Sequence, residues 1–238
     1  MPFSGMNGGG GFRKAAGEAS KENMKEKQAR NFLKLGERLE MTIEGVAFGG
    51  SGIGRVRDLV LFVPFAVDGD LLEIEVSMVR RTYALGRIRR ILKPSPYRTS
   101  PRCPYYERCG GCQYQHIAYE HQLEIKKRQV AETFARIGKQ PDPPVRDVLP
   151  SPLPYAYRGK AEFHLQGKAG KIPVIGYKEE ADSRIVPVPR CDLLDETIND
   201  SLSAFRKKRT ALYASRRGGG VREERVIFWS ESGEDRAG

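Results

Sequence analysis

The four cysteines of this chain constrain its fold more than any other feature. Three of them lie close together in a C-x5-C-x2-C pattern and the fourth follows much later, so that the set is Cys103, Cys109, Cys112 and Cys191. The chain contains 4 Cys in total, and none is left over. Four thiolates are the complete ligand set of a [4Fe–4S] cluster and also of a structural zinc site. The spacing therefore predicts a metal site that ties two distant segments together.

The spacing favours an iron–sulfur cluster over zinc. Structural zinc sites usually combine one close Cys pair with a second close pair of Cys or His. His116 would complete such a local set with Cys103, Cys109 and Cys112, which leaves zinc as the alternative. An iron–sulfur cluster tolerates a three-plus-one arrangement, as in plant-type ferredoxins. The glycine pair before Cys112 is expected to let the backbone turn tightly around one centre.

The charge of the chain favours a polyanionic partner. Its 238 residues carry a formal net charge of +11, and 30% of them are charged. Such an excess of Lys and Arg favours nucleic acid, although a merely soluble basic surface has the same composition. We expect no membrane contact and no secretion, because we find neither an apolar run of spanning length nor a signal segment. The expected location is cytoplasmic, where a Cys cluster indicates metal rather than disulfide.

The pattern of apolar residues predicts two modules after a flexible basic tail at residues 1–36. In the first module, residues 37–95, short alternating strands separated by Gly- and Asp-rich turns predict an OB-like β-barrel. The second module, residues 96–238, begins with a Pro-rich connection and the Cys motif, and its pattern predicts an α+β domain. Its expected elements are a helix over 119–137 capped by Gly138, strands at 160–166, 172–177 and 184–188, a helix over 193–209 and a strand at 225–229.

A basic stretch at the end of the first module is a second candidate site. It contains no acidic residue, and its cations are Arg80, Arg81, Arg87, Arg89, Arg90, Lys93 and Arg98. Guanidinium groups suit phosphate, and exposed bases can stack on the rings of the interleaved Tyr83 and Tyr97. The stretch therefore predicts RNA contact, with a solvated barrel face as the alternative.

Together these residues resemble the RNA uracil-C5-methyltransferases that carry an N-terminal TRAM domain and a [4Fe–4S] cluster. The barrel is similar to TRAM at 43–55 and 61–66, and residues 103–116 are similar to the cluster motif of that family. Residues 157–161 resemble the start of its central domain, and 185–191 resemble the approach to its fourth cluster ligand. The resemblance implies S-adenosylmethionine-dependent methylation of structured RNA, with ribosomal RNA expected, by a monomer. It also adds Arg158 and Lys160 to the expected RNA contacts.

The resemblance also raises an expectation about what is missing. Members of the family continue into a Rossmann-like domain that binds S-adenosylmethionine and carries a nucleophilic Cys. We expect this methyltransferase domain to be absent, so that the chain holds no catalytic residue and no S-adenosylmethionine site, because the cluster claims all four cysteines. The helix over 119–137 would dock on that domain, and without it the stripe of Leu123, Val130, Phe134 and Ile137 would be unusually exposed.

Three other functions fit parts of the pattern. One is a stand-alone, non-catalytic RNA-binding iron–sulfur protein, and another is a zinc-ribbon nucleic-acid module. The third is a TRAM-bearing radical methylthiotransferase, which is disfavoured because its cysteine triad is spaced C-x3-C-x2-C and its TRAM domain is C-terminal.

Overall fold

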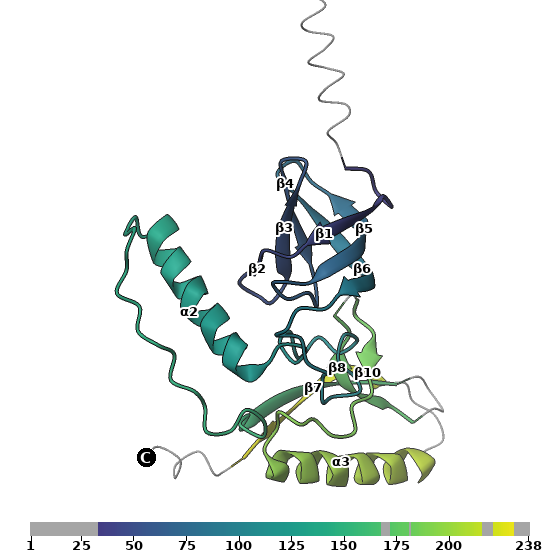
Figure 1. Ribbon diagram of the computed structural model, residues 1–238. Helices are drawn as coiled ribbons and strands as arrows, with labels where there is room; N and C mark the ends of the chain where they lie inside the picture. Colours follow the sequence, from purple (N-terminus) through teal and green to yellow (C-terminus); the bar gives the residue numbers. More distant parts are fainter. Residues whose placement is uncertain (1–32, 168–171, 181, 216–220, 231–238) are drawn as a thin grey trace, which may run out of the picture.

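The structure is a computed structural model that describes residues 33–167, 172–180, 182–215 and 221–230. Figure 1 shows a β-barrel stacked above a second, smaller sheet, with helix α2 beside the barrel and helix α3 beneath the second sheet. Of the tail expected at 1–36, residues 1–32 lie outside the described residues. Leu33 already packs in the core of the barrel. Within the described residues, no helix is both long and apolar enough to cross a membrane.

The barrel is a six-stranded sheet with the strand order β1-β5-β6-β4-β3-β2. Neighbouring strands are antiparallel, except that β4 and β6 run parallel. Its inner face follows the alternation of the sequence, since Leu72, Ile74 and Val76 of β5 are all buried. The strands are β1 (Arg38–Thr42), β2 (Gly45–Val46), β3 (Gly52–Val56), β4 (Leu59–Val63), β5 (Leu71–Val79) and β6 (Tyr83–Lys93).

The barrel closes where β3 passes β1. A Cβ atom at Gly54 would lie only 2.8 Å from the backbone oxygen of Thr42 and would collide with Met41. Any larger residue would push the two strands apart, so glycine is required for this close approach. The Gly-rich segment therefore has two roles. Gly54 lets the barrel close, and Gly49 and Gly50 form the turn before β3 with positive φ angles of 94° and 92°.

The second module is a four-stranded antiparallel sheet with one helix packed on it. The strand order is β10-β7-β8-β9, with β7 (Lys160–Gly167), β8 (Val174–Lys178), β9 (Ile185–Val186) and β10 (Val221–Trp229). Helix α3 (Glu196–Ser215) buries Ile198 and Leu202 in the same core as Phe163 and Leu165 of β7. The strands and the helix occur in the expected order.

Helix α3 begins three residues later than expected. Leu193 and Leu194 are buried in the core ahead of it. The carboxylate of Asp195 accepts a hydrogen bond of 2.9 Å from the backbone N–H of Thr197, which is the geometry of an N-terminal cap. The sequence signal was therefore an Asp cap, which apolar periodicity alone overlooks.

Helix α2 (Tyr119–Arg136) lies against the barrel through an unexpected face. Its buried residues are His121, Ile125 and Gln129. The expected cap at Gly138 is wrong, because the helix is capped by Ile137 and the left-handed residue is Lys139, with φ 57°. The apolar stripe is exposed as expected at its C-terminal end, where Val130 is 41%, Phe134 48% and Ile137 78% exposed, while Leu123 is half-buried.

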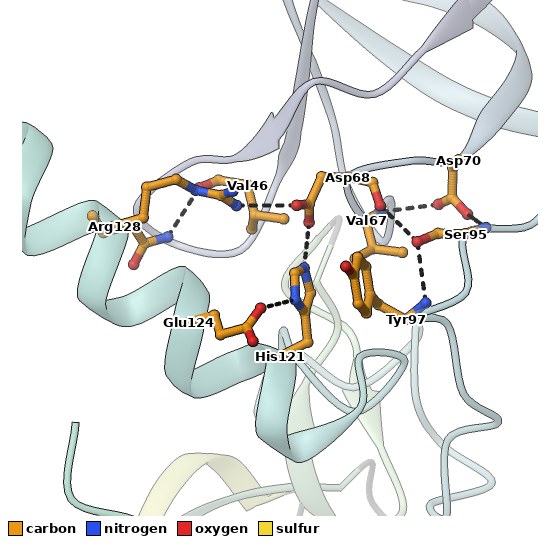
Figure 2. A network of polar contacts seen from close by, with 10 residues as sticks. Val46, Val67, Asp68, Asp70, Ser95, Tyr97, His121, Glu124 and Arg128 are labelled. Carbon is orange, nitrogen blue, oxygen red and sulfur yellow. Dashed lines mark hydrogen bonds and ion pairs between the residues drawn. The ribbon is translucent and has the colours of Figure 1, made fainter. Parts of the chain in front are cut away.

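A polar network joins α2 to the barrel (Figure 2). The ring of His121 lies between two carboxylates, with Nε2 2.9 Å from Asp68 and Nδ1 2.8 Å from Glu124. Arg128, which lies one turn beyond Glu124 in the helix, also donates to Asp68 at 3.1 Å. The ring of Tyr97 stacks on His121 with 3.6 Å between centroids, so His121 covers one face of the ring, while the residue remains 42% exposed.

Candidate metal centre and nucleic-acid interface

The four cysteines line one small cavity between the Cys loop and the second sheet. The cavity is also lined by Tyr106, Gln115, Arg158 and Tyr177. Three of the thiols come from the loop after the Pro-rich connection, and Cys191 comes from the segment between β9 and α3. The structure therefore brings the distant fourth cysteine to the other three, as the spacing predicts.

The free volume of this cavity limits which groups fit between the thiols without bonding to them. Its free volume is about 10 Å³, room for about one water molecule. A metal–thiolate bond of about 2.3 Å is much shorter than a van der Waals contact, so a group bonded to the thiols can occupy more than this free space. Within the described residues, no set of three or more His, Cys, Asp or Glu side chains is arranged to hold a single metal ion.

The electrostatics of the cavity suit a positively charged group. Burial raises the pKa of Cys109 to about 11, and the other thiols contribute to the rise because thiolates repel one another. Burial likewise raises the pKa of Cys112 and of Cys191. The raised pKa values favour the neutral form of these three thiols, whereas a bound metal would supply the positive charge that deprotonates them.

Hydrogen bonds from two amide side chains hold Cys103, Cys112 and Cys191 in position. Gln115 accepts a hydrogen bond from the backbone N–H of Cys103 at 3.1 Å, and its amide donates to Sγ of Cys112 at 3.3 Å. On the other side, Asn199 of α3 accepts from the N–H of Cys191 at 3.0 Å and donates to its carbonyl oxygen at 3.1 Å. One amide side chain thus holds each of the two segments, as expected of the surroundings of a metal centre.

The structure does not support His116 as a metal ligand. Its Nδ1 lies 2.6 Å from the hydroxyl of Tyr106, and the ring packs near Phe65 of the barrel rather than lining the cavity. Burial lowers the pKa of His116 to about 4, so the ring is neutral at pH 7. His116 instead links the Cys loop to the barrel.

The basic stretch is less available than its sequence indicates. Arg89 forms an ion pair of 2.8 Å with Glu75, and Arg90 one of 3.1 Å with Glu73. Arg98 is mostly buried against the fully buried Asp70. Glu73 and Glu75 lie on β5, the strand that pairs with β6, and Asp70 directly precedes β5, so the sequence of the stretch alone does not reveal these partners. Six of the seven cations are exposed, namely Arg80, Arg81, Arg87, Arg89, Arg90 and Lys93, and two of these six are the ion-paired Arg89 and Arg90.

The two expected RNA contacts in the second module lie apart from that stretch. Arg158 is half-buried and lines the thiol cavity. Lys160 is exposed on β7, with Nζ 5.7 Å from the ring centroid of Trp229. The expected RNA-binding residues therefore do not form one cluster.

An open groove beside the thiol cavity was not predicted. Its volume is about 650 Å³, and it runs between the Cys loop, the first half of α2 and residues 151–158. Four tyrosines line it, namely Tyr114, Tyr119, Tyr155 and Tyr157. They are scattered through the sequence with no regular spacing, so the only available signal was the number of Tyr near the Cys motif.

The comparisons with known proteins agree with the TRAM resemblance of the first module. The TRAM domain model matches residues 33–88. An uncharacterized RNA methyltransferase of Gloeobacter violaceus is 40% identical over 176 residues, which are 74% of this chain and 38% of that protein. One of Synechocystis is 38% identical over 186 residues, 76% of this chain and 40% of the relative. The chain belongs to the family of TRAM-containing RNA methyltransferases. It spans about two fifths of the length of these relatives.

Solved structures were matched as well. The chain aligns with the Pyrococcus abyssi tRNA (uracil-54, C5)-methyltransferase with a TM-score of 0.49 and 22% identity, over 71% of this chain and 36% of that one. A conserved protein of Methanococcus maripaludis matches with a TM-score of 0.24 and 33% identity, over 24% of this chain and 83% of that one.

One expectation about the fold class of this family member is wrong. We expected the methyltransferase domain to be absent, but the matched relatives are RNA methyltransferases, and the aligned part is only about two fifths of their length. The expectation treated the last residue of the sequence as the end of the protein. Because the matched relatives are more than twice as long as the aligned part, the chain is to be compared with only a part of them.

Proposed function

We propose that this chain is the RNA-binding and [4Fe–4S]-holding part of an S-adenosylmethionine-dependent RNA uracil-C5-methyltransferase. The TRAM match and the RNA methyltransferase relatives support RNA as the partner. The uracil-C5 target follows from the resemblance of the Cys motif and its flanking segments. Structured RNA, with ribosomal RNA as the first candidate, and a monomer in the cytoplasm belong to the same proposal.

The observation that carries the cluster proposal is the convergence of the four thiols on one cavity. Cys103, Cys109, Cys112 and Cys191 would each bind one iron of the cluster. When bound, the cluster would supply a rigid link between the Cys loop and the segment before α3, and thus folding free energy. Gln115 and Asn199 would keep the two segments in place for it.

The metal content of the purified protein tests this proposal. Protein purified without oxygen should be brown and should contain iron and sulfide in nearly equal amounts. Cys191→Ser should lose the colour as fully as Cys109→Ser, because both thiols line the same cavity. Colourless wild-type protein with stoichiometric zinc would contradict the cluster and support the zinc alternative.

RNA binding is tested separately, through its dependence on salt. Affinity should fall steeply as salt rises, since each neutralised phosphate releases counterions. Arg87→Gln should reduce the slope by about one, because the side chain is exposed. Arg89→Gln should reduce it less, because Glu75 already pairs with Arg89. A slope that neither substitution changes would place the RNA away from β6.

A further inference from the structure

We propose that the tyrosine-lined groove beside the thiol cavity binds unpaired nucleotides of the RNA, with bases stacked on its rings. The groove is the one of about 650 Å³ described above, within the usual range for ligand sites. This inference rests on the proposed function, because it specifies where and in what form the RNA is held.

The rings of the groove suit bases rather than an apolar partner. Base–aromatic stacking requires a flat face that a base can reach, and Tyr157 offers one, since it is 53% exposed. Tyr114, Tyr119 and Tyr155 are half-buried, so each is anchored while part of it faces the groove. The hydroxyl of Tyr119 accepts a hydrogen bond of 2.7 Å from the backbone N–H of Ser151, which fixes one wall. Such a groove is built before the RNA arrives.

Cations lie close to two rings of the groove. Nζ of Lys126 is 5.2 Å from the ring centroid of Tyr114. The guanidinium of Arg102, which also pairs with Asp192 at 3.5 Å, is 5.0 Å from the ring centroid of Tyr155. Lys126 and Arg158 line the groove, against a single lining carboxylate, that of Glu120. This charge balance favours a polyanion, in agreement with the net charge of +11 of the whole chain.

The ring faces of the groove also predict whether it binds single-stranded or duplex RNA. Bases inside a duplex are stacked on each other and cannot reach a protein ring, whereas loops and single strands expose them. The groove should therefore prefer single-stranded RNA. The larger groove of about 1080 Å³ between the barrel and the end of α2 fits this role less well, because Glu44 and Glu132 balance the charge of its two cations, Arg55 and Arg136.

The test uses a fluorescently labelled, uridine-rich single strand of roughly eight nucleotides, within the site sizes of stacking proteins. Its affinity for the whole chain is measured by anisotropy and compared with that of a duplex of equal length. Tyr157→Ala should weaken binding of the single strand about tenfold, as expected for the loss of one stack, with an unchanged salt slope. Tyr157→Phe keeps the ring and should retain the affinity of the wild type.

Matched variants separate the groove from the rest of the surface. Phe134→Ala removes a similarly exposed ring of α2 that does not line the groove, and it should leave the affinity unchanged. Lys126→Gln should lower the salt slope by about one, whereas Lys127→Gln should change it less, because Lys127 pairs with Asp147.

Two results would overturn the inference. If Tyr157→Ala binds like Phe134→Ala while the wild type still binds RNA, the groove is not the site and only the proposed function stands. In that case the groove is free to contact another part of the protein. If the wild type binds neither single strand nor duplex, the inference and the proposed RNA partner fail together.

Discussion

At the scale of single residues, Asn199 holds the backbone of Cys191, one of the proposed cluster ligands. It is buried, and its amide forms hydrogen bonds with both the N–H and the carbonyl of Cys191. Asn199→Ala would leave the N–H of Cys191 unpaired, which costs about 1–3 kcal/mol, whereas the carbonyl of Cys191 would keep its hydrogen bond from the N–H of Leu194. We expect the variant to keep all four thiols yet contain less iron and lose it faster to a chelator. Asp200→Ala, at an exposed position of the same helix, is the control, and equal iron retention would show that Asn199 is not needed.

A second residue-scale prediction concerns Asp70, which is fully buried. Burial alone would raise its pKa, but hydrogen bonds from Arg98 and from the N–H groups of Val67 and Ser95 outweigh this, and the pKa is lowered. A lowered folded-state pKa means that the carboxylate stabilises the fold above the unfolded value of 3.8, and that this contribution is lost as pH falls through the folded value.

Asp70→Asn should therefore reduce the free energy of unfolding by about 3 kcal/mol at pH 7, because it leaves Arg98 without its buried partner. The difference in the free energy of unfolding between the variant and the wild type should become smaller below pH 3.8. Anaerobic urea unfolding at several pH values measures it, with the exposed Asp142→Asn as control. A difference that does not change with pH would mean that the carboxylate charge is not responsible.

At the scale of elements, the sequence predicts the strands better than the helix surfaces. Alternation locates β5 because every second residue faces one core, as Leu72, Ile74 and Val76 do. The buried face of α2 is invisible to an apolar pattern, because two of its three members are His121 and Gln129. Their partners are Asp68 and the backbone of β2, far away in sequence. The cysteine site was predictable because four thiols have few other uses, whereas the groove depends on segments that only the fold brings together.

The hydrogen bonds that attach α2 to the barrel predict how fast the backbone of this helix exchanges hydrogen. The amide of Gln129 donates to the carbonyl oxygens of Val46 and Ala47, each at 3.0 Å, and to the hydroxyl of Tyr114 at 3.2 Å. Gln129→Ala would remove these hydrogen bonds between α2 and the barrel, and we expect faster hydrogen exchange over the second half of α2. The exposed Glu132→Ala should exchange like the wild type. Unchanged exchange in Gln129→Ala would mean that Ile125 and the Asp68 network hold the helix by themselves.

At the scale of the whole molecule, the thiol cavity and the tyrosine groove share a wall. Cys112, Gln115 and Arg158 line both of them. Cys103 and Cys112 are partly exposed, whereas Cys109 and Cys191 are buried. Cys112 lines the groove and Cys103 does not, so the groove is one open side of the cavity. A strand of RNA in the groove would cover this wall and keep oxygen and water from Cys112. The two proposals are therefore coupled physically.

This coupling predicts that RNA protects the cluster. In air, the visible absorbance of the wild type should decay more slowly with saturating single-stranded RNA than without it. Tyr157→Ala at the same RNA concentration should decay nearly as fast as RNA-free protein, because its groove is less occupied, and Phe134→Ala should be protected like the wild type. Equal decay of the wild type with and without bound RNA would show that the bound strand does not cover Cys112. Since binding itself is measured independently by anisotropy, that result would place the strand outside the groove without contradicting RNA binding by the chain.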